Sequence, residues 1–319
     1  SSDVCSSDLA FCANPCIDRT VSIPQFTYGG MNRIEDVRQD GSGKGVNVAI
    51  ACRQLGMEAA CIGLMGRENG ALVRARMERD GVVCDFLEFD GSVRINTKVL
   101  DRATGIVTEI NEKGQPVTAA QVSAMVEACV AWAGRSDFLV LTGSLPPGCP
   151  DDLYAQITRA VRQAAPGCRV LLDAEGEKLR QGLAAQPYMI KPNRYELELL
   201  AGRELPRIQD VHAFAQELTR QGIEVVTVSL GGDGAYVTDG SAAFFAPILD
   251  VPVRSTVGAG DSMVAGMLRG FHLGLSPVEA FRHGVAAASS SVTTEGTLLV
   301  DRAVYEDLLS QVKLVDMAG

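Results

Sequence analysis

Residues 255–262, with the sequence STVGAGDS, bring closely spaced glycines next to a carboxylate. The glycines allow successive backbone N–H groups to converge, and the apolar helix predicted just after them adds partial positive charge at its N-terminus. Such a turn suits an anion, above all the charge that develops on a phosphoryl group in transfer. Asp261 stands at its mouth, where a carboxylate can take the proton of an attacking hydroxyl. We therefore expect a catalytic turn made of Gly258, Ala259, Gly260 and Asp261.

A purely structural role for this turn is the alternative, with Asp261 as a helix N-cap and the glycines as a tight turn. Two other phosphate-binding motifs are excluded. The pair Gly43-Lys44 is followed by Gly45 instead of Ser or Thr, and Arg38 stands where a P-loop needs its first glycine. No G-x-G-x-x-G follows a strand-like run, so a dinucleotide-binding fold is not indicated either.

The elements that must position the turn alternate between helical and strand-like patterns from about residue 118 onward. Helices are predicted at 118–134, 151–165, from Arg194, 210–221, 262–273, 276–293 and 301–313. Strands are predicted at 138–141, 169–172, 188–191 and 224–229. The strands are continuous apolar runs, which is typical of strands buried on both faces. This alternation predicts an α/β fold with a mostly parallel sheet covered by helices.

Two segments, 19–40 and 92–112, interrupt this alternation with strand-like patterns that enclose no helix. The second segment is predicted to be a hairpin that turns near residues 103–105. Together the segments can form a small sheet that projects as a lid. We expect one domain over residues 10–319, with strand character beginning at Ala10. The Ser- and Asp-rich segment 1–9 is interpreted as non-native or disordered and receives no functional residue.

Composition excludes several classes of function. A net charge of −10 argues against nucleic-acid and anionic-membrane binding, which need basic surfaces. No apolar run reaches the 18 residues of a membrane span. The nine cysteines lie mostly in apolar runs, which is typical of reduced thiols in a cytoplasmic protein. None of the three histidines has the spacing of a zinc site.

Several ordered motifs resemble the PfkB (ribokinase-like) family of carbohydrate kinases. They are NPCIDRT (14–20), DGSGKGVNVA (40–49), TGSLPPG (142–148), KPNRYELE (191–198), VSLGGDGA (228–235) and the turn STVGAGDSMVAG. Ser42 stands where the family usually has the first of two glycines. The resemblance implies a three-layer α/β/α fold with a β-sheet lid, and an enzyme that uses ATP with Mg²⁺. Asp261 would then be the general base.

The substrate class is also implied by this resemblance. The segments NPCIDRTV, VRINTKV and GIVTEIN are most similar to the branch that phosphorylates ketohexose monophosphates. Conversion of fructose 1-phosphate to fructose 1,6-bisphosphate is therefore the first expectation, and phosphorylation of tagatose 6-phosphate is the alternative. A non-catalytic sugar- or nucleotide-binding protein on the same fold is an alternative of another class.

The family's sugar-binding residues are carried over by position. They are Asp18, Arg33, Gly43, Lys44, Asn47, Arg94, Asn96, Lys98 and Ser144. Arg33, Arg94 and Lys98 are the candidates for the phosphate that the substrate already carries, and Arg94, Asn96 and Lys98 share one face of their strand. The alternatives are a turn aspartate for Asp18, an ordinary first-turn residue for Asn47, and solvated lid charges for the arginines.

The ATP side is implied by the same resemblance. Its residues are Lys191, Asn193, Ser229, Gly231, Gly234, Gly258 and Gly260, with Glu196 binding Mg²⁺ through water. Asn193 and Glu196 also fit a helix capping box, and the two roles are compatible. The adenine pocket is expected around residues 246–258 and 286–290. The partners are thus ATP and a small sugar phosphate, and an exposed lid edge favours a homodimer.

Overall fold

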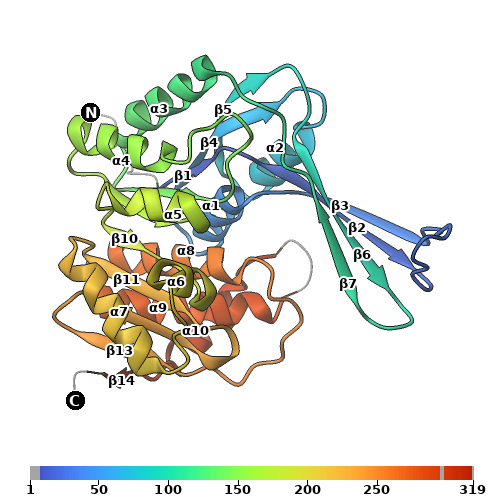
Figure 1. Ribbon diagram of the computed structural model, residues 1–319. Coiled ribbons are helices and arrows are strands. Elements are labelled where there is room, and N and C mark those ends of the chain that lie inside the picture. The colour runs from blue at the N-terminus through green and yellow to red at the C-terminus, as the bar shows by residue number, and fades with distance from the viewer. Residues whose placement is uncertain (1–7, 295–297, 318–319) are drawn as a thin grey trace.

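The computed structural model describes residues 8–294 and 298–317, and its main body has three layers, with a central sheet between two groups of helices (Figure 1). Within the described residues this sheet has ten strands, in the order β14-β13-β12-β11-β10-β9-β8-β1-β4-β5. The strands are β1 (Asp8–Cys12), β4 (Ala59–Gly66), β5 (Val83–Phe89), β8 (Phe138–Thr142), β9 (Arg169–Asp173), β10 (Met189–Ile190), β11 (Val225–Ser229), β12 (Ala235–Thr238), β13 (Ala243–Ala246) and β14 (Val315–Asp316). Neighbours from β11 to β5 are parallel, and β12, β13 and β14 are added antiparallel. The mostly parallel sheet predicted from the sequence is confirmed.

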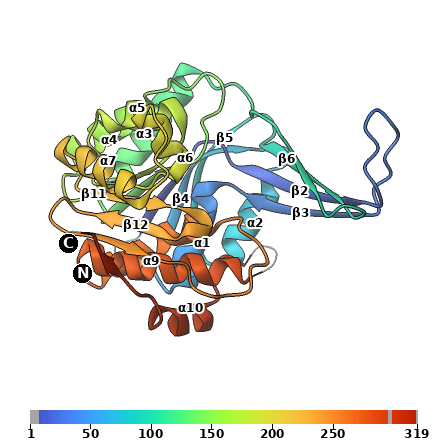
Figure 2. The ribbon, with the colours of Figure 1, turned by 60° about the horizontal axis from the view of Figure 1, so that its bottom comes forward.

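The helices pack on both faces of this sheet (Figure 2). One face carries α1 (Lys44–Gln54), α2 (Ala71–Arg79), α8 (Ala259–His272), α9 (Pro277–Val292) and α10 (Arg302–Leu309). The other carries α3 (Ala119–Ala133), α4 (Leu153–Ala164), α5 (Gly176–Leu183), α6 (Arg194–Ala201) and α7 (Ile208–Arg220). Along β1, Ala10 and Cys12 enter the first core while Leu9 and Phe11 enter the second, which is why this strand is apolar at successive positions.

A second sheet projects from the body, and we call it the lid sheet (Figure 1). Its strands, in the order β3-β2-β6-β7, are β2 (Cys16–Ile23), β3 (Asp36–Ser42), β6 (Arg94–Asp101) and β7 (Val107–Asn111). β3 and β7 pair antiparallel with their neighbours, while β2 and β6 are parallel. The lid strands expected in 19–40 and 92–112 and the turn near 103–105 are therefore present.

The register of the lid sheet puts the predicted sugar-binding residues of β2 and β6 on one face. Asp18 lies opposite both Asp40 and Asn96, and Lys98 lies opposite Thr20. Because side chains alternate along a strand, the odd-numbered residues of β2, including Val21, point to the other face. The polar face belongs to the site described below.

Most of the predicted boundaries differ from the structure by one to three residues, and three differences are described here. β1 begins at Asp8 rather than Ala10, because Leu9 is buried in the core, so part of the segment 1–9 belongs to the sheet. Residues 1–7 lie outside the described residues. β10 is one residue shorter at each end than the predicted strand 188–191. The last helix ends at Leu309 rather than at residue 313, because the chain turns back to pair β14 with β13.

The eight cysteines in the described part of the chain are free thiols, and most of them are buried. Their burial was predicted from the apolar runs around them, while the reduced state and the cytoplasmic location stay predictions. Separately, none of the helices in residues 8–294 and 298–317 combines the length and apolarity that crossing a membrane requires.

Candidate active site

The glycine-rich turn forms the N-terminus of α8. Gly258 is the N-cap residue, with φ at 82°. Only glycine fits there, because a Cβ at this position would collide with the Leu299 side chain. Asp261 is the third residue of the helix and only 5% exposed. The alternative role of Asp261 as the N-cap is therefore wrong. The first backbone N–H groups of a helix have no intrahelical partner, so those of Gly260 and Asp261 can donate to an anion, while Ala259 N donates to the Thr256 carbonyl at 3.4 Å.

Asp261 is held in place by α1. Its Oδ2 accepts a hydrogen bond from Asn47 Nδ2 at 2.9 Å. Burial raises the pKa of Asp261 to about 6, with Asp173 acting in the same direction and Lys44, Asn47 and Lys191 opposing it. A carboxylate with this pKa is ionised at neutral pH and yet basic enough to take a proton, which is what a general base requires.

An ion-pair cluster lies beside the turn, with Asp173 and Lys191 buried and Lys44 partly exposed. Asp173 ends β9, and its Oδ1 is 3.4 Å from Lys191 Nζ and 3.7 Å from Lys44 Nζ. Burial by itself would raise the pKa of Asp173, but Lys191 and Lys44 outweigh it and the pKa is lowered. A Cβ added to Gly260 would stand 3.2 Å from Lys191 Nζ, so this ammonium group borders the anion turn.

Lys44 and Gly43 were predicted on the sugar side. Lys44 is the first residue of α1, and the carboxylates of Asp173 and, to a smaller extent, Asp261 raise its pKa, so its ammonium group interacts with both. Gly43 is the N-cap of α1 with φ at 141°, and a Cβ there would be 2.8 Å from Cys12 Sγ. The close packing of this turn explains why glycine is needed at position 43.

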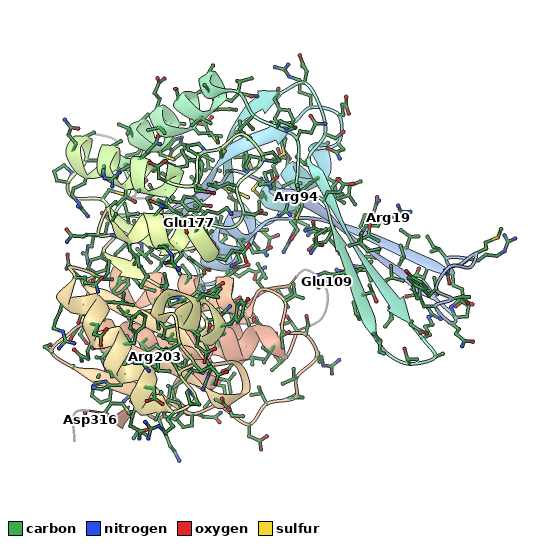
Figure 3. All side chains as sticks on the ribbon, viewed as in Figure 1. Arg19, Arg94, Glu109, Glu177, Arg203 and Asp316 are labelled. Atoms are coloured by element: carbon green, nitrogen blue, oxygen red, sulfur yellow. The ribbon has the colours of Figure 1, made fainter. Side chains whose placement is uncertain are left out.

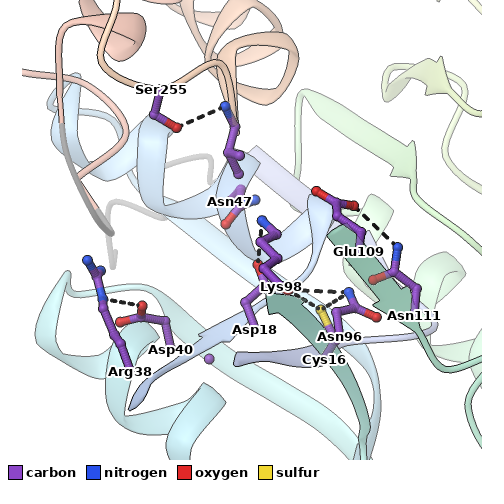
Figure 4. A network of polar contacts seen from close by, with 12 residues as sticks. Cys16, Asp18, Arg38, Asp40, Asn47, Asn96, Lys98, Glu109, Asn111 and Ser255 are labelled. Carbon is purple, nitrogen blue, oxygen red and sulfur yellow. Dashed lines mark hydrogen bonds and ion pairs between the residues drawn. The ribbon is translucent and has the colours of Figure 1, made fainter. Parts of the chain in front are cut away.

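The polar face of the lid sheet meets the catalytic turn across a cavity. Asp18 Oδ1 accepts from Asn96 Nδ2 at 3.3 Å, and Asp18 Oδ2 is 3.9 Å from Lys98 Nζ (Figure 4). The cavity has a volume of about 220 Å³ and reaches from these strands to Ser255 and Val257. Its lining residues are Asp18, Thr20, Arg38, Asp40, Ser42, Asn47, Arg76, Lys98, Ser255, Val257 and Leu299. We call it the lid cavity.

Arg94 lies at the root of the lid sheet, where it joins the body (Figure 3). Its guanidinium donates to the carbonyl oxygens of Asn14 and Glu112 and to Asn96 Oδ1. It lines a second cavity, of about 300 Å³, together with Ser144, Lys113 and Lys178. Arg94 and Lys98 therefore share a strand face, as predicted, but they line different cavities.

Arg33 is not brought to either cavity. It is exposed in the connection between β2 and β3, which starts beyond Ile23. Ile23 is five residues along the strand from Asp18, about 16 Å at a rise of about 3.3 Å per residue. The register of β2 thus separates Arg33 from the other residues predicted to bind the substrate's phosphate.

The predicted ATP-side residues surround the start of α6. Asn193 is its N-cap, and its Oδ1 accepts from Glu196 N at 2.9 Å while Glu196 Oε2 accepts from Asn193 N at 2.8 Å. The capping box considered from the sequence is thus formed. Ser229 forms an isolated β-bridge with Asn193. The short 3-10 turn Gly231–Asp233 follows, with Gly231 as its first residue and Gly234 directly after it, both with positive φ. Over residues 8–294 and 298–317, no group of three or more His, Cys, Asp or Glu side chains is arranged to hold a metal ion.

Two residues of the site were missed in the sequence. Asp173 follows directly on the apolar run 169–172, and a polar residue at the carboxyl end of a buried strand was an available signal. Arg76 donates to Asn47 Oδ1 at 3.2 Å. It stands in α2 near Arg74 and Arg79, so nothing in the pattern distinguishes it from a surface charge.

Comparisons with known proteins agree with this geometry. The sequence profile described as pfkB family carbohydrate kinase matches residues 4–302. A 1-phosphofructokinase of Escherichia coli K12 is 34% identical, and the match covers 94% of this chain and 96% of the relative. A 1-phosphofructokinase of Haloferax volcanii is 36% identical, with 95% of each protein covered. The tetrameric inhibited form of phosphofructokinase-2 from Escherichia coli superposes with a TM-score of 0.88 at 29% identity, over 96% of this chain and 99% of that one.

Proposed function

Because the chain belongs to the pfkB family of carbohydrate kinases, we propose that it phosphorylates fructose 1-phosphate with ATP, yielding fructose 1,6-bisphosphate. The observation that carries the chemistry is Asp261, a buried carboxylate with a pKa of about 6 in the first turn of a helix. Two cavities support the substrate class: the lid cavity, which Asn47 beside Asp261 lines, and the second cavity, which Arg94, Lys113 and Lys178 line.

Transfer of the γ-phosphoryl group would proceed by direct attack of a sugar hydroxyl. Asp261 takes the hydroxyl proton as the new oxygen–phosphorus bond forms and the bond to ADP breaks. The N–H groups of the catalytic turn stabilise the charge on the transferring group. Lys191 Nζ, at the edge of the turn, and Lys44 neutralise the phosphates of the nucleotide.

ATP is used by kinases together with a divalent ion, and Mg²⁺ fits the residues present. Glu196 Oε2 is engaged in the capping box, which leaves Oε1 to accept from a metal-bound water. Mg²⁺ retains several waters and takes phosphate oxygens, so it does not need a cage of protein ligands. Bound there, it would add positive charge beside the phosphates.

The acceptor would lie between the lid sheet and the catalytic turn. Asp18 and Asn96 would bind sugar hydroxyls, since a carboxylate can accept from two neighbouring hydroxyls. Lys98 is 3.9 Å from Asp18, so it would support that carboxylate. The phosphate already on the sugar would bind in the cavity that holds Arg94, Ser144, Lys113 and Lys178.

Initial rates of ADP release test the proposal, with fructose 1-phosphate, tagatose 6-phosphate, fructose 6-phosphate and fructose compared side by side. We expect the highest kcat/KM with fructose 1-phosphate, because the similar proteins are 1-phosphofructokinases. Fructose should have a low kcat/KM, because it has no phosphate to bind in the cavity of Arg94, Lys113 and Lys178. A preference for tagatose 6-phosphate would keep the mechanism and change the substrate. A preference for fructose would contradict the phosphate site, and no turnover with any of them would favour a non-catalytic binding protein.

A homodimer through the lid sheet is proposed as the assembly. Within residues 8–294 and 298–317, β3 and β7 form the two edges of the lid sheet, and every residue of β7 is exposed. On the face opposite the lid cavity, Val37 and Ile110 are 46% and 60% exposed. A second copy of the sheet would cover these apolar side chains. Light scattering is expected to give twice the chain mass of 33.8 kDa at micromolar concentration, and a monomer would contradict the proposal.

A further inference from the structure

Arg76 carries a buried charge, and burying a charged side chain costs free energy that its contacts must offset. It is 7% exposed, and burial lowers the pKa of its guanidinium. Its Nη1 donates to the carbonyl oxygen of Gly41 at 2.6 Å and to Asn47 Oδ1 at 3.2 Å. Asn47 in turn donates to Asp261, so these contacts join α2, α1 and α8 in one chain.

The chemistry of the three side chains determines which way the central amide faces. A guanidinium has only donors, an ionised carboxylate has only acceptors, and an amide has one end of each kind. With Arg76 on one side, the Asn47 oxygen must face the guanidinium. The Asn47 NH₂ group must then face Asp261, where it stabilises the ionised form. A side chain able to accept at position 76 would permit the opposite orientation.

Arg76 also connects this chain of contacts to the lid. Gly41 belongs to β3, and a Cβ there would collide with the backbone of Val73 in α2. The root of β3 thus lies directly on the helix that carries Arg76. Arg76 Nη1 donates both to the Gly41 carbonyl and to Asn47 Oδ1, so any shift of this strand moves the guanidinium relative to the Asn47 amide.

We propose that Arg76 is a positioning residue for the transfer reaction, acting through the Asn47 amide to orient and ionise Asp261 and linking that carboxylate to the root of the lid. The inference rests on the proposed function, in which Asp261 is the base. It adds a residue outside the motifs of the site, on a helix that contributes no other group to it.

The other charged groups around Asp261 and Arg76 must be kept unchanged in the test. Asp261 faces Lys44 at the start of α1, Asp173 at the end of β9 and Lys191 after β10. Arg76 faces Asp40, Asp80, Asp18 and Arg79. A neutral side chain of similar length at position 76 leaves all of these in place, so Arg76→Met is the informative variant. Arg76→Lys keeps a head group that can only donate.

The experiment measures kcat as a function of pH for wild type, Arg76→Met and Arg76→Lys, with Arg282→Met as the control. Arg282 is a partly buried arginine that donates to the Val312 carbonyl in a different region. We expect Arg76→Met to lower kcat on the order of tenfold and to move the acidic limb up by about one pH unit, as for loss of a hydrogen bond to a charged group. Arg76→Lys should keep kcat and the acidic limb close to their wild-type values, and Arg282→Met should change neither kcat nor the acidic limb.

A second readout does not depend on turnover. The ¹³C chemical shift of the Asp261 carboxyl group, followed by NMR against pH, should titrate about one unit higher in Arg76→Met than in wild type. Equal pKa values for Asp261 in the two proteins, or equal losses in Arg76→Lys and Arg76→Met, would overturn the inference and leave Arg76 with a structural role. Full activity of Asp261→Asn would instead overturn the proposed base, whatever the NMR titration shows.

Discussion

Replacing Asp261 with asparagine is expected to lower kcat by about 10²- to 10⁴-fold, the usual contribution of a general base. Asparagine has nearly the same shape and fits the same pocket, but its amide cannot take a proton from the sugar hydroxyl. Because the N–H groups of the turn and the lysines remain, ATP and the sugar phosphate should still bind. Initial rates with fructose 1-phosphate and calorimetric titration with a non-hydrolysable ATP analogue separate the two effects.

The wild-type pH profile provides an independent check on the same carboxylate. Asp261 must be ionised to act as a base, and its pKa is about 6, so kcat/KM should fall as the pH drops through about 6. Asp90→Asn is a suitable control, since Asp90 is an exposed surface residue paired with Arg67. Loss of nucleotide binding together with turnover in Asp261→Asn would show that Asp261 is structural, and an unchanged kcat would exclude it as the base.

Replacing Asp173 with asparagine is expected to reduce the free energy of unfolding by about 3–5 kcal/mol at neutral pH, the usual cost of removing one partner from a buried ion pair. Asp173 neutralises both Lys191 and Lys44, and the side chains of Asp173 and Lys191 are almost fully buried. Urea denaturation of the two proteins at pH 7 measures the difference. Glu306→Gln, which breaks the exposed pair with Arg302, should change stability by less than about 1 kcal/mol.

The effect of Asp173→Asn should depend on pH in a defined direction. The folded-state pKa of Asp173 lies below its unfolded value of about 3.9, so the carboxylate stabilises the protein above about pH 4 and loses this contribution as the pH falls further. The difference between wild type and variant should therefore shrink below pH 4. A constant difference from pH 7 to pH 3 would contradict the ion-pair explanation. Because Asp173 raises the pKa of Asp261, the variant should also shift its acidic limb to lower pH.

The parts of the site that the sequence predicts are those formed by consecutive residues. The catalytic turn and the Asn193 capping box each lie within one short segment, so glycine spacing and capping rules are sufficient to find them. Alternating apolar runs likewise predict the parallel sheet. The lid hairpin is local too, and its turn is marked in the sequence near residues 103–105.

The parts that escaped prediction depend on contacts between distant segments. Arg76 acquires its role from Asn47, 29 residues away, and from Asp261 beyond it. Arg94 and Lys98 share one face of β6 but line different cavities. Strand periodicity cannot show this, because each cavity is also lined by segments distant in the sequence. Arg33 was grouped with them by resemblance, and only the strand register shows that the length of β2 separates them.

The parallel pairing at the centre of the lid sheet constrains the order in which the protein folds. Cys16 pairs with Arg94, a separation of 94 − 16 = 78 residues, and the chain between them makes α1, β4, α2 and β5 of the body. The outer pairs, β2 with β3 and β6 with β7, are local and close short loops. Pairing β2 with β6 costs more conformational entropy, because it closes the long loop between them. The two hairpins should therefore associate only after α1, β4, α2 and β5 have formed. The lid sheet is thus assembled late in folding, and a chain in which it has not formed cannot bind the sugar.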